Sequence, residues 1–289
     1  MTATLYEARP VRRRRTSAEL DVIDDAIVAS VEVEYPTTLR GVYYRVVSAG
    51  AVPKTEAGYD LVGRQLLKLR RSGRIAYSRI TDGTRLVRKP ASWSRLDVML
   101  QSAALSYRRA LWDDQAVEVM VLSEKDAITG AVYPVTAAWD VELGVVRGYA
   151  SETFAHNIAE TVQENHNRGK RTYVYQLGDH DPSGVDGWRS FQERVHGFAP
   201  TADAVLERLA VTPEQITAYN LPTRPTKTTD TRAAGFAGDS VEVDALPATA
   251  LRAIVEAAIV RHVDDRALDL TRVAERSERE TLQRIAGVG

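Results

Sequence analysis

The residues best suited to chemistry in this chain are acidic side chains in two short motifs. Val-Leu-Ser-Glu-Lys-Asp-Ala at residues 121–127 contains Glu124, and Leu-Gly-Asp-His-Asp-Pro-Ser-Gly at residues 177–184 contains Asp179 and Asp181. Each motif follows an apolar run typical of a strand and opens into a helical pattern. Because parallel α/β sheets bind ligands at the carboxyl ends of their strands, we expect the three carboxylates to meet there. Hard oxygen donors suit Mg²⁺, so the motifs predict phosphoryl chemistry on a polyanion.

The elements that must position these acids alternate between strand and helix. Such a βαβαβα order predicts a mostly parallel sheet between helix layers, in an α/β domain covering residues 106–289. The expected strands are Val117–Leu122, Gly144–Arg147 and Thr172–Leu177, and the expected helices are Lys125–Ala131, Ser151–Asn167 and Ser183–Val195. A connector at Asn220–Gly238, an edge strand at Val241–Ala245 and the helices Ala248–Val263 and Leu270–Ile285 complete this domain.

The chain before residue 106 has a different pattern. Apolar residues at helical spacing predict helices at Ser17–Val31, Leu39–Ser48 and Asp60–Ser72. Two strands, Ile75–Ile80 and Leu86–Arg88, flank an Asp-Gly pair that is a strong hairpin signal. Three helices followed by a basic hairpin make a winged helix-turn-helix, which we place at residues 21–105 behind a basic arm at residues 1–20.

Basic side chains in this part could contact DNA. Arg64, Lys68 and Arg71 share one face of the third predicted helix, while Arg79 and Arg85 belong to the hairpin. A helix in this position commonly enters the DNA major groove. A solvated helix face would show the same stripe, so the stripe alone favours neither interpretation. The basic hairpin beside it favours DNA.

Composition limits the function classes without selecting one. The 289 residues carry a formal net charge of −1 that hides a run of arginines at Arg12–Arg15. With no cysteine, the chain has no disulfide framework, thiolate zinc site or thiol nucleophile. The sequence has no apolar stretch of membrane-spanning length, so we expect a soluble protein of the cytoplasm, associated with the nucleoid through DNA. It also has no glycine loop of the kind that binds ATP.

The motifs together resemble a known family. The Glu-Lys-Asp-Ala and Asp-His-Asp-Pro-Ser-Gly motifs resemble those of a Toprim domain, the metal-binding module of topoisomerases and primases. Leu39-Arg40-Gly41-Val42-Tyr43-Tyr44 resembles the catalytic motif of the topoisomerase VI A subunit and its meiotic break-forming relatives. At this length the chain looks most like the minimal A-subunit-like proteins of bacteria and phages. Gly41 departs from the family, which commonly has a polar or acidic residue there.

This resemblance implies Mg²⁺-dependent cleavage and rejoining of both DNA strands. Tyr44 would be the nucleophile that forms a 5′-phosphotyrosyl bond, and Arg40 would steady the phosphate. Glu124, Asp179 and Asp181 would hold Mg²⁺, or Mn²⁺, and Glu124 would also act in catalysis. The family works as a homodimer in which the tyrosine of one subunit acts with the acids of the other. A separate ATPase subunit of the B type would supply strand passage.

Two other interpretations of the same residues stay open. The chain could be a Toprim nuclease that hydrolyses DNA with metal-activated water, or a DNA-binding module without catalysis. Adjacent tyrosines on an amphipathic helix are commonly one core residue and one surface residue. Tyr43 and Tyr44 alone therefore do not indicate catalysis, and that interpretation also requires the downstream acids.

Overall fold

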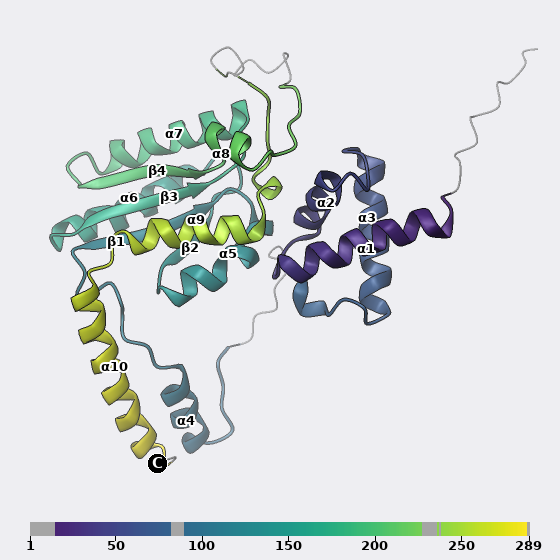
Figure 1. Cartoon of the computed structure of the whole chain (residues 1–289). Helices are drawn as coiled ribbons and strands as arrows, with labels where there is room; N and C mark the ends of the chain where they lie inside the picture. The colour runs from purple at the N-terminus through teal and green to yellow at the C-terminus, as the bar shows by residue number, and fades with distance from the viewer. Residues whose placement is uncertain (1–14, 82–89, 227–235, 237, 288–289) are drawn as a thin grey trace, which may run out of the picture.

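The computed structural model describes residues 15–81, 90–226, 236 and 238–287, and it combines helices with one four-stranded sheet (Figure 1). This confirms the expected mixture of helices with a parallel sheet. The predicted strand Leu86–Arg88, with Arg85, lies outside the described residues, as do Arg12, Arg13 and Arg14. No helix in the described ranges is long and apolar enough to cross a membrane.

The sheet is parallel throughout. Its strands β1 (Val117–Ser123), β2 (Glu142–Val145), β3 (Arg171–Leu177) and β4 (Ala204–Ala210) lie in the order β2-β1-β3-β4. In the register of β1 with β3, Ser123 pairs with Leu177. The residues that follow these two strands therefore leave the sheet side by side.

Helices cover both faces of the sheet because the strand residues are apolar on both sides. Met120 and Leu122 belong to one core with α6 (Glu152–Asn167) and α7 (Pro182–Phe198). Val119 and Val121, which point the other way, belong to a second core with α5 (Asp126–Ala138) and α9 (Ala248–Val260). Figure 1 shows the sheet between these two helix layers.

A helical unit, residues 15–81, precedes the sheet. It consists of α1 (Ser17–Val33), α2 (Leu39–Ser48) and α3 (Glu56–Arg71), which pack on one another through fully or nearly fully buried aliphatic side chains. Threonines at positions 16, 38 and 55 cap the three helices, because each side chain accepts a hydrogen bond from a backbone N–H of the first turn. The three predicted helices are confirmed, although α3 begins at Glu56 rather than Asp60.

Two predicted strands are wrong. Residues 75–80 contain a 3₁₀ turn at Tyr77–Arg79, and Ile80 pairs with Thr37 only as an isolated bridge. Residues 241–245 likewise hold one bridge, between Val241 and His180, followed by a 3₁₀ turn at Val243–Ala245. There the N–H of Val243 donates to the carboxylate of Asp179 at 2.9 Å, so it is not free to pair with a strand.

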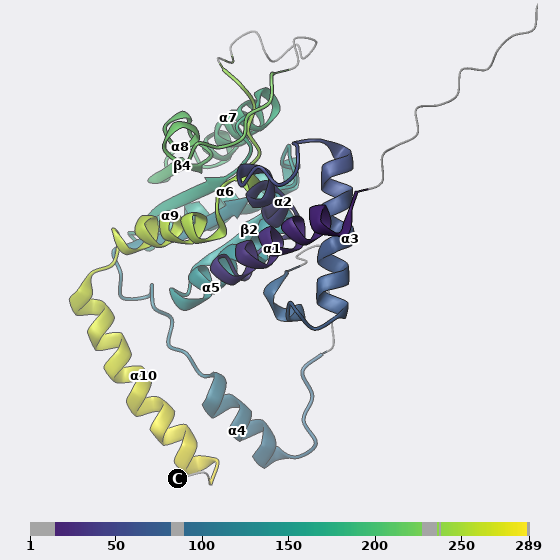
Figure 2. The same cartoon turned by 45° about the vertical axis from the view of Figure 1, so that its right-hand side comes forward.

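Several other boundaries differ from the predicted ones. The second strand is displaced to Glu142–Val145, because Arg147 and Gly148 have positive φ and form a turn. The strand β4 and the helices α4 (Leu96–Ser106) and α8 (Pro213–Ala218) were not predicted. The last helix, α10 (Asp265–Ile285), begins at Asp265 rather than Leu270. Helices α4 and α10 lie side by side and project from the sheet as an arm (Figure 2).

Candidate functional site

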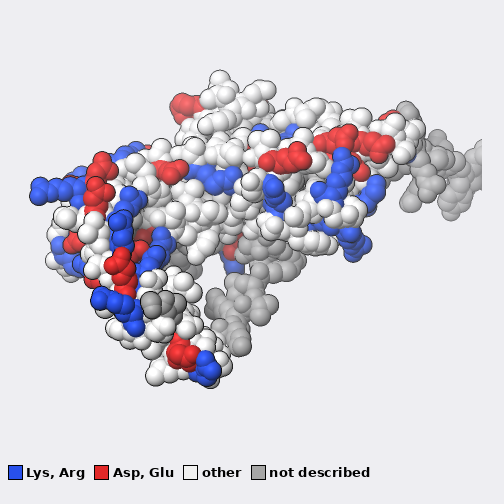
Figure 3. Space-filling view, turned by 60° about the horizontal axis from the view of Figure 1, so that its bottom comes forward, with Lys and Arg blue, Asp and Glu red and all other residues white. Residues whose placement is uncertain are grey.

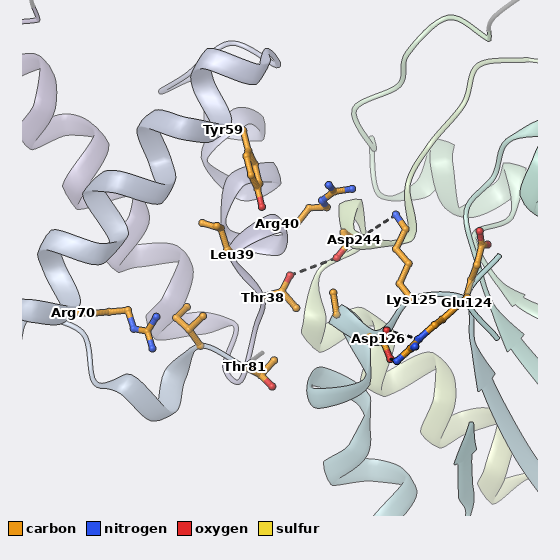
Figure 4. A pocket seen from close by; sticks show the side chains of 13 residues that line it. Thr38, Leu39, Arg40, Tyr59, Arg70, Thr81, Glu124, Lys125, Asp126 and Asp244 are labelled. Atoms are coloured by element: carbon orange, nitrogen blue, oxygen red, sulfur yellow. Dashed lines mark hydrogen bonds and ion pairs between the residues drawn. The ribbon is translucent and has the colours of Figure 1, made fainter. Parts of the chain in front are cut away.

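A cleft of about 620 Å³ separates the helical unit from the carboxyl edge of the sheet. Thr38, Arg40 and Tyr59 line it from the helical unit, while Glu124 and Lys125 line it from the end of β1. Figure 4 shows Thr38 and Arg40 on one side and Lys125 on the other, with Asp244 between them and Glu124 on the far side of Lys125. The cleft therefore brings together one predicted phosphate ligand and one predicted metal ligand.

Lys125 lies at the centre of the charged groups. Its Nζ is 2.9 Å from Asp179 Oδ1, 3.1 Å from Glu242 Oε2 and 3.2 Å from Asp244 Oδ2. Burial alone would lower the pKa of Lys125, but the three carboxylates outweigh it and raise that pKa. Lys125 is therefore an ammonium ion that neutralises part of an acidic cluster.

Two acids in this cluster connect it to α2. Glu242 forms an ion pair with Arg40, and the hydroxyl of Thr38 donates to Asp244 at 3.5 Å. Burial would raise the pKa of Glu242, but Lys125 and Arg40 outweigh it and lower that pKa to about 2. The acidic segment, residues 240–246, thus joins the helical unit to the sheet through an ion pair and a hydrogen bond.

Glu124 lies against the loop that follows β3. Its Oε2 accepts a hydrogen bond from the backbone N–H of Asp179 at 2.9 Å. Burial, and then the neighbouring charge of Asp179, raise the pKa of Glu124; burial also raises the pKa of Asp179. The structure therefore brings these two predicted ligands together at the edge of the sheet.

The third predicted ligand, Asp181, has a structural role in the described arrangement. It caps α7 by accepting the N–H of Gly184 at 2.8 Å, and its other oxygen lies 3.6 Å from Arg224. Arg208 of β4 supports the same loop, donating to the carbonyl oxygens of Asp179 and Gly184. Neither Arg208 nor its strand β4 was among the features predicted from the sequence.

A divalent metal fits these residues by donor type. Carboxylate oxygens are the donors that Mg²⁺ prefers, and a cation beside Glu124 and Asp179 would favour the ionised form of both. Within the described ranges, however, no three acidic or histidine side chains are grouped as a metal site. One reason is that Lys125 already forms an ion pair with Asp179, while Asp181 accepts a hydrogen bond from Gly184 as the N-cap of α7.

Tyr44, the predicted nucleophile, is buried on the same helix as Arg40. Only 4% of its surface is exposed, and Lys54 Nζ lies 5.4 Å from the centre of its ring. Burial, and then the charge of Glu242, raise the pKa of Tyr44. Tyr43 is buried as well, and its hydroxyl donates to the carbonyl of Thr55 at 3.1 Å. Neither tyrosine is therefore the surface member of the pair.

The predicted DNA ligands of α3 lie on its exposed side. Arg64, Lys68 and Arg71 are exposed, and Lys68 lies 3.4 Å from the buried carboxylate of Asp24. Arg79 stacks over the ring of Tyr35, with 3.5 Å from its guanidinium carbon to the ring centre. On the face in Figure 3, basic and acidic side chains are interspersed, with no broad area of one sign. That face gives no sign of a continuous basic surface.

Gly184 packs closely against the loop that follows β3, which leaves no room for a larger residue. A Cβ added to Gly184 would lie 2.5 Å from the carbonyl oxygen of Asp179, a backbone atom that cannot swing away. We expect Gly184→Ala to reduce the free energy of unfolding by about 1–3 kcal/mol. Gly197→Ala, in open space on the same helix, should increase it by about 0.5–1 kcal/mol. Chemical denaturation measures both, and equal effects of the two variants would contradict the close packing.

Glu242 should stabilise the fold in a pH-dependent way. Its pKa is lowered from 4.5 to about 2, so its ion pairs stabilise the protein above about pH 4.5, and this is lost as the pH falls toward 2. We expect Glu242→Gln to lower the free energy of unfolding at pH 7 by on the order of 2 kcal/mol, and by much less near pH 2.

The measurement is the difference between the wild-type and variant unfolding curves at each pH. Taking the difference removes the opposite contributions of other acids, such as Glu124, whose pKa is raised. The control is Glu207→Gln, which breaks a half-exposed ion pair with Arg261 and should have little effect. A pH-independent difference for Glu242→Gln would contradict its ion pairing.

Comparison with known proteins assigns no family to this geometry. No protein-family model, curated protein or solved structure matches the chain.

Proposed function

We propose that this chain cleaves and rejoins DNA in the manner of a topoisomerase VI A subunit, with Tyr44 as the nucleophile. The observation that carries the proposal is the placement of α2. Arg40 enters the cleft opposite Glu124 and Lys125, and Tyr44 lies one helical turn further along. A cation for the phosphate, a hydroxyl nucleophile and a set of carboxylates are thus held in one region.

The reaction is a transesterification. The hydroxyl oxygen of Tyr44 attacks a backbone phosphorus, the bond to the 3′ oxygen breaks, and a 5′-phosphotyrosyl bond and a free 3′ hydroxyl result. The proton lost by Tyr44 is balanced by the proton gained at the 3′ oxygen. Arg40 stabilises the negative charge that develops on the phosphate, and it keeps its own charge because Glu242 and Asp244 raise its pKa against the effect of burial.

Burial sets a condition on this reaction. Because burial and Glu242 raise the pKa of Tyr44, its hydroxyl is a weak nucleophile in the described arrangement. A DNA phosphate bound by Arg40 would bring the phosphorus toward α2, where Arg40 and Lys125 both act to lower the pKa of Tyr44. Mg²⁺ held by Glu124, Asp179 and Asp181 would supply positive charge for the leaving 3′ oxygen.

The proposed partners follow from this function. Double-stranded DNA is the substrate, contacted by Arg64, Lys68 and Arg71 through its phosphates. A homodimer would match the two-fold symmetry of the duplex and cut both strands. Strand passage would require a separate ATPase subunit, and the site of action would be the nucleoid in the cytoplasm.

Hydrolysis is the second candidate, and the burial of Tyr44 favours it. Glu124 lines the cleft, whereas Tyr44 has only 4% of its surface exposed. Water beside the carboxylates could then attack the phosphate in place of the tyrosine. The products would carry free 5′ phosphates and no attached protein.

Tyr44→Phe should abolish covalent attachment to DNA. Supercoiled plasmid is incubated with protein and Mg²⁺ or Mn²⁺, quenched in detergent, and run with and without protease. We expect the protein-linked linear DNA to fall at least about 1,000-fold in the variant, because its nucleophilic oxygen is gone. Tyr43→Phe, which loses the neighbouring hydroxyl, is the matched control and should keep cleaving. Protein-free cuts that survive Tyr44→Phe would favour hydrolysis instead.

Lys125→Gln should strengthen divalent-metal binding. Removing the ammonium frees Asp179 and makes the cluster one charge more negative. We expect the affinity for Mn²⁺ to rise about tenfold, or about 1.4 kcal/mol, in calorimetric titration. Lys170→Gln breaks a comparable ion pair with Glu118 at the other end of the sheet, and it should leave metal affinity unchanged. Unchanged or weaker binding by Lys125→Gln would contradict the competition.

A further inference from the structure

The helices α4 and α10 form an arm that projects from the sheet (Figure 2). One face of α10 is used inside this arm, because the hydroxyl of Tyr107, at the end of α4, donates to Glu278 at 2.7 Å. Of the residues within α10, only Leu268 and Thr271, near its start, are buried. The other faces of α10 lie open along most of its length.

The shorter helix of the arm lacks cover for its apolar side chains. Seven of the eleven residues of α4 are apolar, but only Ala104 is buried. Leu96 and Leu105 are 68% and 78% exposed. A helix that is apolar on all sides is normally buried in a core. The arm therefore has an open surface of the kind that marks an interaction site.

A second stripe on α10 is exposed and uncharged. It consists of residues at steps of three or four, which share one face of a helix: Leu270, Val273, Ser277, Thr281 and Ile285. The leucine, the valine and the isoleucine are 64%, 62% and 63% exposed. The small serine in the middle of the stripe would let another helix approach closely there, because the side chains at a contact set the distance between helix axes.

The stripe is symmetric about its centre. Position 277 lies midway, to within one residue, between Leu270 and Ile285 and also between Val273 and Thr281. Two copies of α10 that run antiparallel and cross at Ser277 would therefore pack Leu270 on Ile285 of the other copy. Val273 would pack on Thr281 in the same way. Each of these pairs would occur twice, as a two-fold axis requires.

The charges beside the stripe follow the same symmetry. Four residues along one edge alternate in sign: Asp269, Arg276, Glu280 and Arg284. Within the described ranges none of the four forms an ion pair. In the antiparallel arrangement Asp269 lies within one turn of Arg284 of the other copy, and Arg276 lies within one turn of Glu280. A parallel arrangement would place each charge beside its own kind. Because complementary charges fix the register of an interface, this pattern favours an antiparallel second copy as the occupant.

We infer that the arm of α4 and α10 is a self-association surface, which pairs antiparallel with the arm of a second copy about Ser277. The four helices form a bundle in which the second copy supplies the cover that α4 lacks. This inference goes beyond the proposed function, which calls for two copies but names no surface, and it does not depend on DNA cleavage.

A cysteine at the proposed axis tests the pairing directly. The natural chain has no cysteine, so an introduced thiol can react only with its own counterpart. We expect Ser277→Cys to form a disulfide-linked dimer under a mild oxidant such as diamide, because the two thiols meet at the axis. Thr281→Cys is the matched control, since both positions are exposed on the same stripe. Its two thiols would lie about 12 Å apart along the axis, beyond disulfide reach. Equal cross-linking of the two variants, or none in Ser277→Cys, would overturn the inference.

Charge reversal tests the same surface without a cross-link. Arg276→Glu and Glu280→Arg each place like charges opposite one another across the axis. We expect each variant to weaken the wild-type dimer at least about tenfold in sedimentation equilibrium. The two variants mixed in equal amounts regain opposite charges, so they should form heterodimers with nearly wild-type affinity. Circular dichroism checks that each variant folds.

Wild-type protein that stays monomeric at every concentration would overturn the inference, even if its arm binds a different protein or a lipid vesicle. A dimer that neither charge reversal weakens, or a mixture that forms no heterodimer, would overturn it as well. A dimer linked through Ser277→Cys that cuts no DNA would count against the proposed function alone. A monomer that attaches DNA to Tyr44 would count against the inference alone.

Discussion

The ammonium of Lys125 is the interaction on which the rest of the site depends. Three carboxylates from two parts of the chain lie within 3.2 Å of it: Asp179 after β3, and Glu242 and Asp244 of the acidic segment. Acids this close and this buried would repel one another without a cation between them. Lys125 therefore holds the acidic segment against the end of β1, and the acidic segment in turn holds α2.

The sheet supplies the second constraint. Ser123 of β1 pairs with Leu177 of β3, so Glu124 and Asp179 leave adjacent parallel strands at the same level. Glycine at positions 178 and 184 lets the carboxylate of Glu124 approach the loop backbone. Strand register and two small residues thus account for the close pair of acids, and Lys125 accounts for their connection to the helical unit.

Sequence patterns predicted the parts of this fold that local rules control. The apolar spacing of α1 and α2 is a local signal, and so are the acidic motifs after β1 and β3. The strand β4 was missed because its sequence, Ala-Val-Leu-Glu-Arg-Leu-Ala, does not alternate between apolar and polar residues. A strand that is packed on both faces can carry apolar residues on both sides, so its sequence need not alternate. Arg208, which supports the loop of Asp179, was missed for the same reason.

The acidic segment shows the opposite error. Val-Glu-Val-Asp-Ala alternates as an edge strand does, but of these five residues only Val241 forms a bridge, and the N–H of Val243 donates to Asp179. The roles of Glu242 and Asp244 depend on Lys125, more than a hundred residues away, and no local pattern carries that information. Their spacing two residues apart, like that of Asp179 and Asp181, was the available signal.

Tyr44 is tested as the nucleophile most directly by identifying the residue to which DNA becomes attached. Trapped complexes are digested with nuclease and trypsin, and the peptides are sequenced by mass spectrometry. Cleavage after Arg40 and Arg45 releases Gly-Val-Tyr-Tyr-Arg, in which fragment masses distinguish Tyr43 from Tyr44. We expect a nucleotide joined through phosphate to Tyr44. A nucleotide on any other residue, or cut DNA with no modified peptide, would contradict it.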